Sequence, residues 1–85
     1  MNILINAGDD LPIYRQVMRQ IMDAIAGGRL SGGERLPSHR ELSEQLVIAP
    51  LTVKKAYDEL EALGFLKMTL AASEKTSWSG GFALV

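Results

Sequence analysis

Apolar residues recur at spacings of three and four in two stretches of the chain, which is the pattern of an amphipathic helix. The first stretch covers residues 12–26 and stops at Gly27. The second covers residues 50–63 and stops at Gly64, where a helix-ending glycine is expected. Both stretches predict helices with one buried face. In the first helix, Gln16 is predicted to lie outside the buried face. The predicted buried residues are Tyr14, Val17, Met18, Ile21 and Ile25 in the first helix and Val53, Ala56, Tyr57, Leu60 and Leu63 in the second.

A shorter helix is predicted between them, beginning after Ser38. The Ser38 hydroxyl can cap its N-terminus while Glu41, three residues on, completes a capping box. The break before the next helix falls at residues 47–49, because Pro50 disfavours a helical backbone in the preceding residue but suits the first position of a new helix. Two helices joined by a tight turn are typical of a helix-turn-helix.

Two short apolar runs after the last helix, at residues 65–68 and 82–85, predict the strands of a wing. The fold class is therefore mostly α with a small β wing: a winged helix-turn-helix of three helices and a two- or three-stranded antiparallel sheet. Residues 69–79 between the strands predict an irregular loop. Trp78 in that loop could plug the core, contact a partner or lie in a loose tail.

Domain boundaries follow from the same pattern. Residues 1–10 form a flexible or strand-like lead-in, and residues 11–85 form the winged helix-turn-helix domain, of which 69–85 are an atypical wing and tail. A chain of 85 residues makes one domain and buries roughly 60–65% of its unfolded surface.

The charge order along the third predicted helix opposes the helix dipole. Lys54 and Lys55 lie near its positive end, and Asp58, Glu59 and Glu61 lie toward its negative end. A phosphate placed against this N-terminus would meet free N–H groups and two ammonium groups, which points to nucleic acid. The alternative is that Lys54 with Asp58 and Lys55 with Glu59 are ordinary surface pairs one helical turn apart.

Several short strings, taken in order, resemble the DNA-binding domain of GntR-type bacterial transcription regulators, and within that family the YtrA-like branch. The resemblance covers residues 11–66. Its strings are PIY at 12–14, GRL at 28–30, RLPS at 35–38, REL at 40–42, TV at 52–53, AY at 56–57 and LExxG at 60–64.

The resemblance implies which residues meet DNA. Arg40 would contact a phosphate or a guanine edge, and the residues that open the third helix would face the major groove. Arg40 could instead pair with Glu44, and Thr52 could cap its helix locally. The predicted DNA-binding residues are Arg35, Arg40, Ala49, Leu51, Thr52, Lys54 and Lys55.

This chain departs from the family pattern in the turn and in the wing. Val47 stands where relatives usually carry glycine, so the turn must avoid a left-handed backbone or bear strain there. Residues 49–51 are Ala, Pro and Leu, which makes hydrogen-bonded base reading poor, although Leu51 could touch a thymine methyl. The segment 69–79 contains a single basic residue, Lys75, where relatives have a basic, glycine-bearing wing tip.

Composition limits the possible functions. The net charge of −1 and the pI near 5.7 argue against strong non-specific binding to DNA, so attraction must come from a local basic patch. No cysteine is present, His39 has no partner at metal-ligand spacing, and no nucleophile or phosphate-loop motif occurs, so no enzyme activity and no cofactor or metal are predicted. No apolar run is long enough for a membrane span and no signal peptide precedes the domain, which predicts a cytoplasmic protein.

The sequence therefore predicts a sequence-specific transcription regulator, a repressor, which reads a palindromic operator in double-stranded DNA through the third helix. Because one acidic module has few bases, a homodimer is expected, with residues 1–5 and 82–85 as candidate pairing edges. The alternative is a winged-helix protein-interaction module without DNA readout; a subunit of a small-ligand enzyme is a remote third reading. The operator and any effector are not specified.

Overall fold

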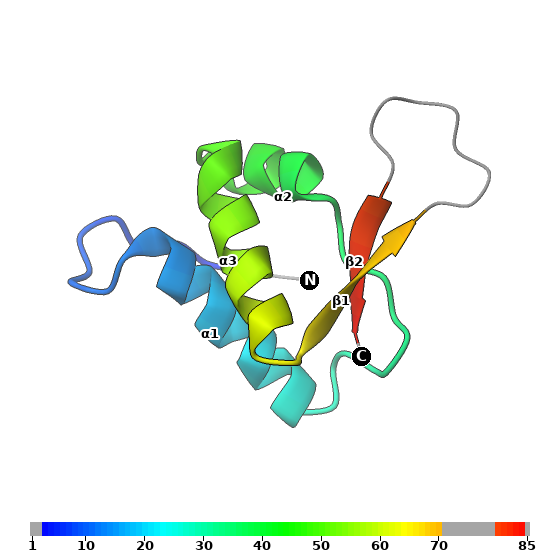
Figure 1. The fold of residues 1–85 in the computed structure, drawn as a ribbon. Coiled ribbons are helices and arrows are strands. Elements are labelled where there is room, and N and C mark those ends of the chain that lie inside the picture. The colour runs from blue at the N-terminus through cyan, green and yellow to red at the C-terminus, as the bar shows by residue number, and fades with distance from the viewer. Residues whose placement is uncertain (1–2, 71–79, 85) are drawn as a thin grey trace.

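The computed structural model describes residues 3–70 and 80–84 of the chain. Three helices pack against one another, and an antiparallel hairpin lies beside them (Figure 1). This arrangement is the predicted one. The elements are α1 (Ile13–Ala26), α2 (His39–Leu46), α3 (Pro50–Ala62), β1 (Leu66–Leu70) and β2 (Gly80–Leu84).

The core lies where α3 crosses α1 and α2. The four inward positions of α3 are fully buried and recur at helical spacing, as predicted, while α1 contributes Val17, Met18 and Ile21. The predicted burial of Leu63 was wrong, because this residue follows the last residue of α3 and is 61% exposed. The helix has ended by then, and Gly64 reverses the chain with a φ of +90°. The buried α3 residues are Val53, Ala56, Tyr57 and Leu60.

Tyr57 ties α3 to the segment that leads into α2. Its ring is completely buried, and its hydroxyl donates a 2.8 Å hydrogen bond to the carbonyl oxygen of Pro37. Burial, and to a lesser extent the nearby Glu41 carboxylate, raise the pKa of the Tyr57 phenol well above its ordinary value. The hydroxyl therefore stays protonated and remains a donor.

The start of α2 is fixed by the predicted capping box. The Ser38 hydroxyl accepts a hydrogen bond from the backbone N–H of Glu41 at 3.1 Å, and the Glu41 carboxylate accepts one from the N–H of Ser38 at 2.9 Å. Pro37, which Tyr57 holds, immediately precedes Ser38. The position of α2 on α3 is therefore set at its first turn by a buried bond and by a cap together.

Residues 3–10 of the N-terminal lead-in form no strand, and two glutamines bind them along α1. The side-chain amide of Gln20 accepts from the N–H and donates to the carbonyl of Leu4, at 2.9 and 2.7 Å. The side-chain amide of Gln16 likewise accepts from the N–H of Asn6 at 2.8 Å and donates to its carbonyl at 2.9 Å. Gln16 is only 7% exposed, so its placement on the polar face of α1 was wrong. An amide carries one donor group and one acceptor, so each glutamine replaces the edge of a neighbouring strand.

The hairpin pairs Leu66 with Leu84 and Leu70 with Gly80. The strands are displaced by one or two residues from the predicted runs, and β1 includes residues 69 and 70, which the sequence had assigned to the loop. Trp78 and the rest of the predicted loop lie outside the described residues.

The connector between α1 and α2 pairs with β2 at one point. The carbonyl of Leu84 accepts from Gly33 at 3.0 Å, and the N–H of Leu84 donates to Glu34 at 2.9 Å. Both backbone groups of Leu84 are therefore satisfied within the chain. At this residue the proposed pairing edge of residues 82–85 is already occupied.

Val47 occupies the left-handed region, with φ 56° and ψ 50°, at the end of α2. The sequence left open whether this turn avoids such a backbone or bears strain, and the structure shows that it bears the strain. A β-branched residue in this conformation is a clear outlier, which costs roughly 1–2 kcal/mol. The side chain is 88% exposed, so burial does not offset that cost.

Replacing Val47 with glycine should stabilise the domain. We expect Val47→Gly to raise the free energy of unfolding by about 1 kcal/mol, because glycine adopts a positive φ without steric cost. Leu63→Gly is the matched control, since Leu63 is also exposed and also follows a helix but has a φ of −83°. That control should lose about 0.5–1 kcal/mol. Equal losses for both variants in urea unfolding would contradict the assigned strain.

Removing the Tyr57 hydroxyl should destabilise the junction of α2 and α3. We expect Tyr57→Phe to lower the free energy of unfolding by about 1–2 kcal/mol at neutral pH, because the Pro37 carbonyl loses its buried donor. The raised pKa adds a pH signature. As pH rises past the ordinary value of 10.0, the unfolded chain releases this proton first, so stability is complete below pH 10 and falls above it.

The variant lacks this ionisation, so the difference in stability between wild type and Tyr57→Phe should shrink above pH 10. Chemical unfolding of both proteins from pH 7 to 11 measures it. A difference that stays constant across this range would show that the phenol is not buried as described.

Candidate nucleic-acid interface

The helix-turn-helix leaves the N-terminal end of α3 open. Its N-cap residue is Ala49, and no side chain caps the helix, so the predicted local cap by Thr52 is not formed. Pro50 stands at the first helical position, where its missing N–H has no consequence. Thr52 is half-buried and its backbone N–H donates to Ala49 at 3.0 Å. The first turn of α3 is therefore exposed and uncapped.

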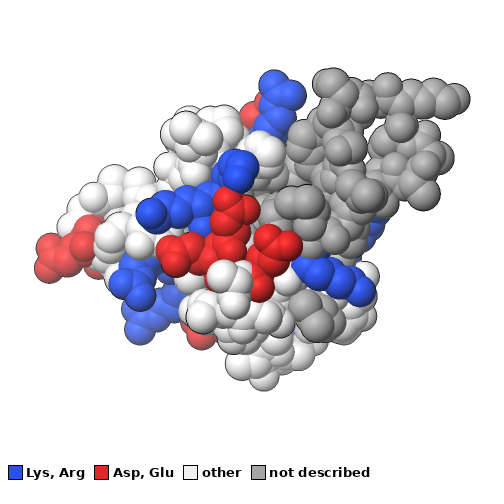
Figure 2. Space-filling model, in the orientation of Figure 1, with Lys and Arg blue, Asp and Glu red and all other residues white. Residues whose placement is uncertain are grey.

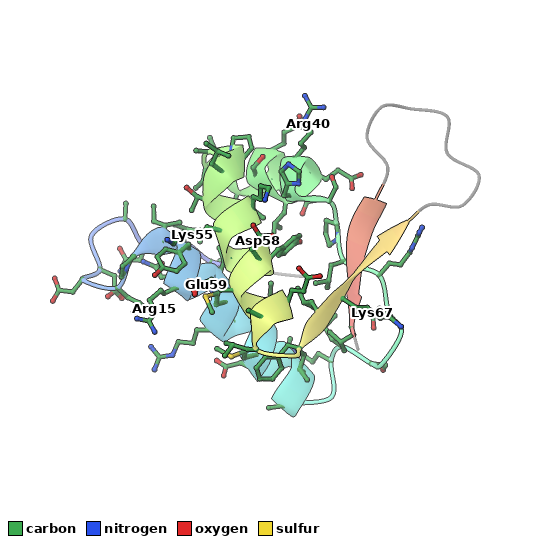
Figure 3. The ribbon with its side chains drawn as sticks, viewed as in Figure 1. Arg15, Arg40, Lys55, Asp58, Glu59 and Lys67 are labelled. Carbon is green, nitrogen blue, oxygen red and sulfur yellow. The ribbon has the colours of Figure 1, made fainter. Side chains whose placement is uncertain are left out.

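The structure brings five of the seven predicted DNA-binding residues onto this end of α3, and all of them except Thr52 are exposed. Ala49, Leu51, Lys54 and Lys55 are all exposed, on the N-cap and the first half of α3. Arg40 is exposed on the second residue of α2, and Figure 3 shows it pointing away from the other labelled side chains. Arg35 is exposed in the connector that pairs with β2.

Lys54 forms one of the two surface pairs that were the alternative to phosphate binding. Its Nζ lies 2.7 Å from Oδ2 of Asp58, one turn further along α3. Both side chains are about half exposed, at 51% and 44%, so water screens the pair and it contributes little to stability. The pair still matters for binding, because it partly neutralises a cation that would otherwise be free to meet a phosphate.

Lys55 does not form the proposed pair with Glu59. Its Nζ lies 4.7 Å from the ring centre of Tyr14, a cation–π contact with the first turn of α1. In Figure 3 the Lys55 side chain extends from α3 toward that end of α1. Lys55 is an exposed residue, and this contact holds its ammonium group to the side of α3.

Arg40 has no carboxylate partner among the residues that the structure describes. Within residues 3–70 and 80–84 the one ion pair is that of Lys54 and Asp58, so the alternative pair of Arg40 with Glu44 is not formed. Glu41, the other carboxylate near Arg40, is already engaged in the capping box. Arg40 is exposed, and no carboxylate of the described residues occupies its guanidinium donors.

Acidic side chains cover the other half of α3. Figure 2 shows carboxylates gathered over α3 in the centre of the view, with basic side chains around them. Asp58 and Glu59, labelled on α3 in Figure 3, belong to this region, and Glu61 is exposed on the same half. A polyanion would be attracted to the first half of α3 and repelled by the second.

Val47 belongs to the exposed end of α3 but was not among the predicted site residues. The sequence treated it only as an unusual turn residue. With Ala49, Pro50 and Leu51 it forms a run of exposed apolar residues in which only Ile48 is half-buried. Its exposure could not be read from sequence, because an apolar residue between two helices is more often buried.

Other kinds of site are not found in the described part of the chain. No group of three or more His, Cys, Asp or Glu residues could hold a metal ion there. No helix among those residues is long and apolar enough to cross a membrane.

Comparisons with known proteins agree with the geometry. The HTH-type transcriptional repressor YtrA of Bacillus subtilis is 38% identical over 65 residues, which are 76% of this chain and 50% of that protein. The structure of YtrA from Sulfolobus acidocaldarius, a GntR-family transcription factor, superposes with a TM-score of 0.79 at 35% identity, covering 98% of this chain and 80% of that one. Both confirm the predicted likeness to YtrA. The chain spans half or less of the length of the curated relatives that it matches.

A third comparison supports the fold. The DNA-binding domain of AraR in complex with operator ORE1 has a TM-score of 0.72 at 22% identity, covering 100% of this chain and 94% of that one. These structures confirm the winged helix-turn-helix. The family model of bacterial regulatory proteins, gntR family, matches residues 13–69. The chain belongs to the gntR family of bacterial regulatory proteins.

Proposed function

We propose that this domain binds double-stranded DNA and represses transcription, with the N-terminal end of α3 in the major groove. The observation that carries the proposal is the uncapped, exposed start of α3, which bears Lys54 and Lys55, together with the exposed Arg40 on α2. Membership of a family of regulatory proteins supports this function over a protein-interaction module. The repressor name of Bacillus YtrA and the operator complex of AraR support it further.

Each cation has a proposed role. Arg40 contacts a phosphate or, with its two-pronged donor set, a guanine edge. Lys54 and Lys55 contact phosphates beside α3, and Arg35 contacts the backbone from the connector. Ala49, Leu51 and Thr52 face the bases, and the half-buried Thr52 reads them only with its exposed side.

The low net charge of the domain bears on its oligomeric state. A net charge of −1 leaves one domain with little attraction for DNA, so we infer that it acts as a homodimer on a palindromic operator. The pairing surface is not residues 3–6 on the side facing α1, because Gln16 and Gln20 occupy their backbone groups there. The protein is proposed to act in the cytoplasm, without catalysis.

Two opposite substitutions test the lysines. Lys54→Ala with Lys55→Ala should weaken binding to a random-sequence duplex and lower the slope of log affinity against log salt by about 1–2, since up to two phosphate contacts are lost. Asp58→Asn should do the reverse, because it releases Lys54 from its ion pair and removes a repelling charge. Fluorescence anisotropy at several salt concentrations measures both effects. Glu61→Gln serves as the matched control, since it removes a charge from the same half of α3 and Glu61 forms no ion pair within residues 3–70 and 80–84.

The assignment of Lys54 requires Asp58→Asn to bind more tightly than Glu61→Gln. Equal affinities for these two variants would mean that only net charge matters. Unchanged affinity of the double lysine variant at low salt would remove both lysines from the interface.

Arg40 is tested separately, because it can contact either a guanine, which depends on the DNA sequence, or a phosphate, which does not. If it bridges a guanine, Arg40→Ala should cost about 1–3 kcal/mol on the selected operator and much less on random DNA. If it contacts only phosphate, the loss should be smaller and equal on both duplexes. Arg15→Ala, on an exposed position of α1, is the control and should change neither affinity. No loss on either duplex would exclude Arg40 from the interface.

A further inference from the structure

The turn between α2 and α3 presents an apolar tip, formed by Val47, Ala49, Pro50 and Leu51. Val47 is 88% exposed and Leu51 76%, and the other two are exposed as well. None of these side chains can donate or accept a hydrogen bond. We propose that this tip selects DNA by packing on thymine methyl groups. This inference rests on the proposed function and specifies how the bases are read.

The distribution of charge on α3 favours docking by its tip. Asp58 lies seven residues beyond Leu51, which is about 10 Å along a helix that rises 1.5 Å per residue. The major groove is roughly 8.5 Å deep. With α3 inserted end-on, residues 47–55 reach the bases and phosphates while the carboxylates of the second half stay outside the groove. If α3 lay flat along the groove, Asp58 and Glu59 would instead approach the phosphates.

The chemistry of the groove then identifies the target. The major-groove edges of the four base pairs present hydrogen-bonding groups, and thymine alone adds a methyl group. An apolar tip gains nothing from the hydrogen-bonding groups and covers them at a cost, but it gains from contact with a methyl. The tip therefore favours thymines at the positions under Leu51 and Val47.

The strain at Val47 is a second, independent observation. Glycine or asparagine would relieve the left-handed backbone, yet the position holds a β-branched residue that is almost fully exposed. Strained residues of this kind concentrate at functional sites. Because the Val47 side chain is exposed, it contributes little to folding. A role in binding DNA would explain why a strained valine stands there.

A protein partner fits the tip less well. Four small side chains fall far short of the roughly 800 Å² per partner that stable protein interfaces bury. Lys54 is exposed on α3 three residues after Leu51 and supplies a cation beside the tip, which suits a phosphate at the edge of a groove. Both the size and the charge of the surroundings favour DNA.

Removal of thymine methyls tests the inference directly. The full chain is used to select duplexes from a random library, and each thymine of the selected site is then replaced by deoxyuridine, which lacks only the methyl. We expect a three- to fivefold loss of affinity for each contacted methyl, from the burial of one such group. Leu51→Ala should bind the thymine duplex more weakly but the deoxyuridine duplex as the wild type does.

Two further variants separate recognition from folding. Val47→Gly relieves the strain, so it should fold more stably and still lose part of the discrimination between thymine and deoxyuridine. Leu63→Ala alters an exposed leucine at the opposite end of α3 and should keep the full discrimination.

The outcomes distinguish this inference from the proposed function. A wild-type chain that binds duplex DNA with equal affinity for thymine and deoxyuridine at every position overturns the methyl contact and leaves DNA binding intact. Equal discrimination by wild type and Leu51→Ala also overturns it. A chain that binds no duplex at low salt overturns the proposed function, and the inference with it.

Discussion

The hydrogen bond from the buried Tyr57 to the half-buried Pro37 carbonyl fixes the relation between α2 and α3, on which the exposed surface depends. It joins the middle of α3 to the residue that precedes the capping box of α2. Both ends of the bond lie next to core residues, since Leu36 and Leu42 are buried on either side of the α2 N-terminus. A rigid junction holds Arg40, at the start of α2, at a fixed place relative to the start of α3.

Electrostatics on α3 then decide how that rigid unit can meet a polyanion. The helix carries its cations in the first half and its carboxylates in the second, against the preference of the helix dipole. One of the two lysines is paired with Asp58 and the other rests on Tyr14. The available positive charge is therefore modest and lies to one end, so contact through the tip of α3 is favoured over contact along its length.

The sequence predicted the helices well because their signals are local. The Ser38 and Glu41 spacing, Pro50 before the third helix and Gly64 after it each determine a helix end through the chemistry of a few neighbouring residues. Leu63 is exposed because α3 ends one residue before it, whereas the burial of Gln16 and the partner of Lys55 depend on what lies across the molecule. Gln16 is buried by a lead-in that returns along α1, and Lys55 meets a ring from another helix. Only the fold brings these residues together.

The proposed DNA-binding surface consists of the turn between α2 and α3, the start of α3 and the exposed Arg40 on α2. Titration of the ¹⁵N-labelled chain with a selected duplex, followed by amide chemical shifts, tests it most directly. The account predicts changes concentrated at residues 38–41 and 47–55, with little change at residues 58–63 of α3 or on α1. Changes concentrated at residues 58–63 or along α1, with none in the turn, would contradict it.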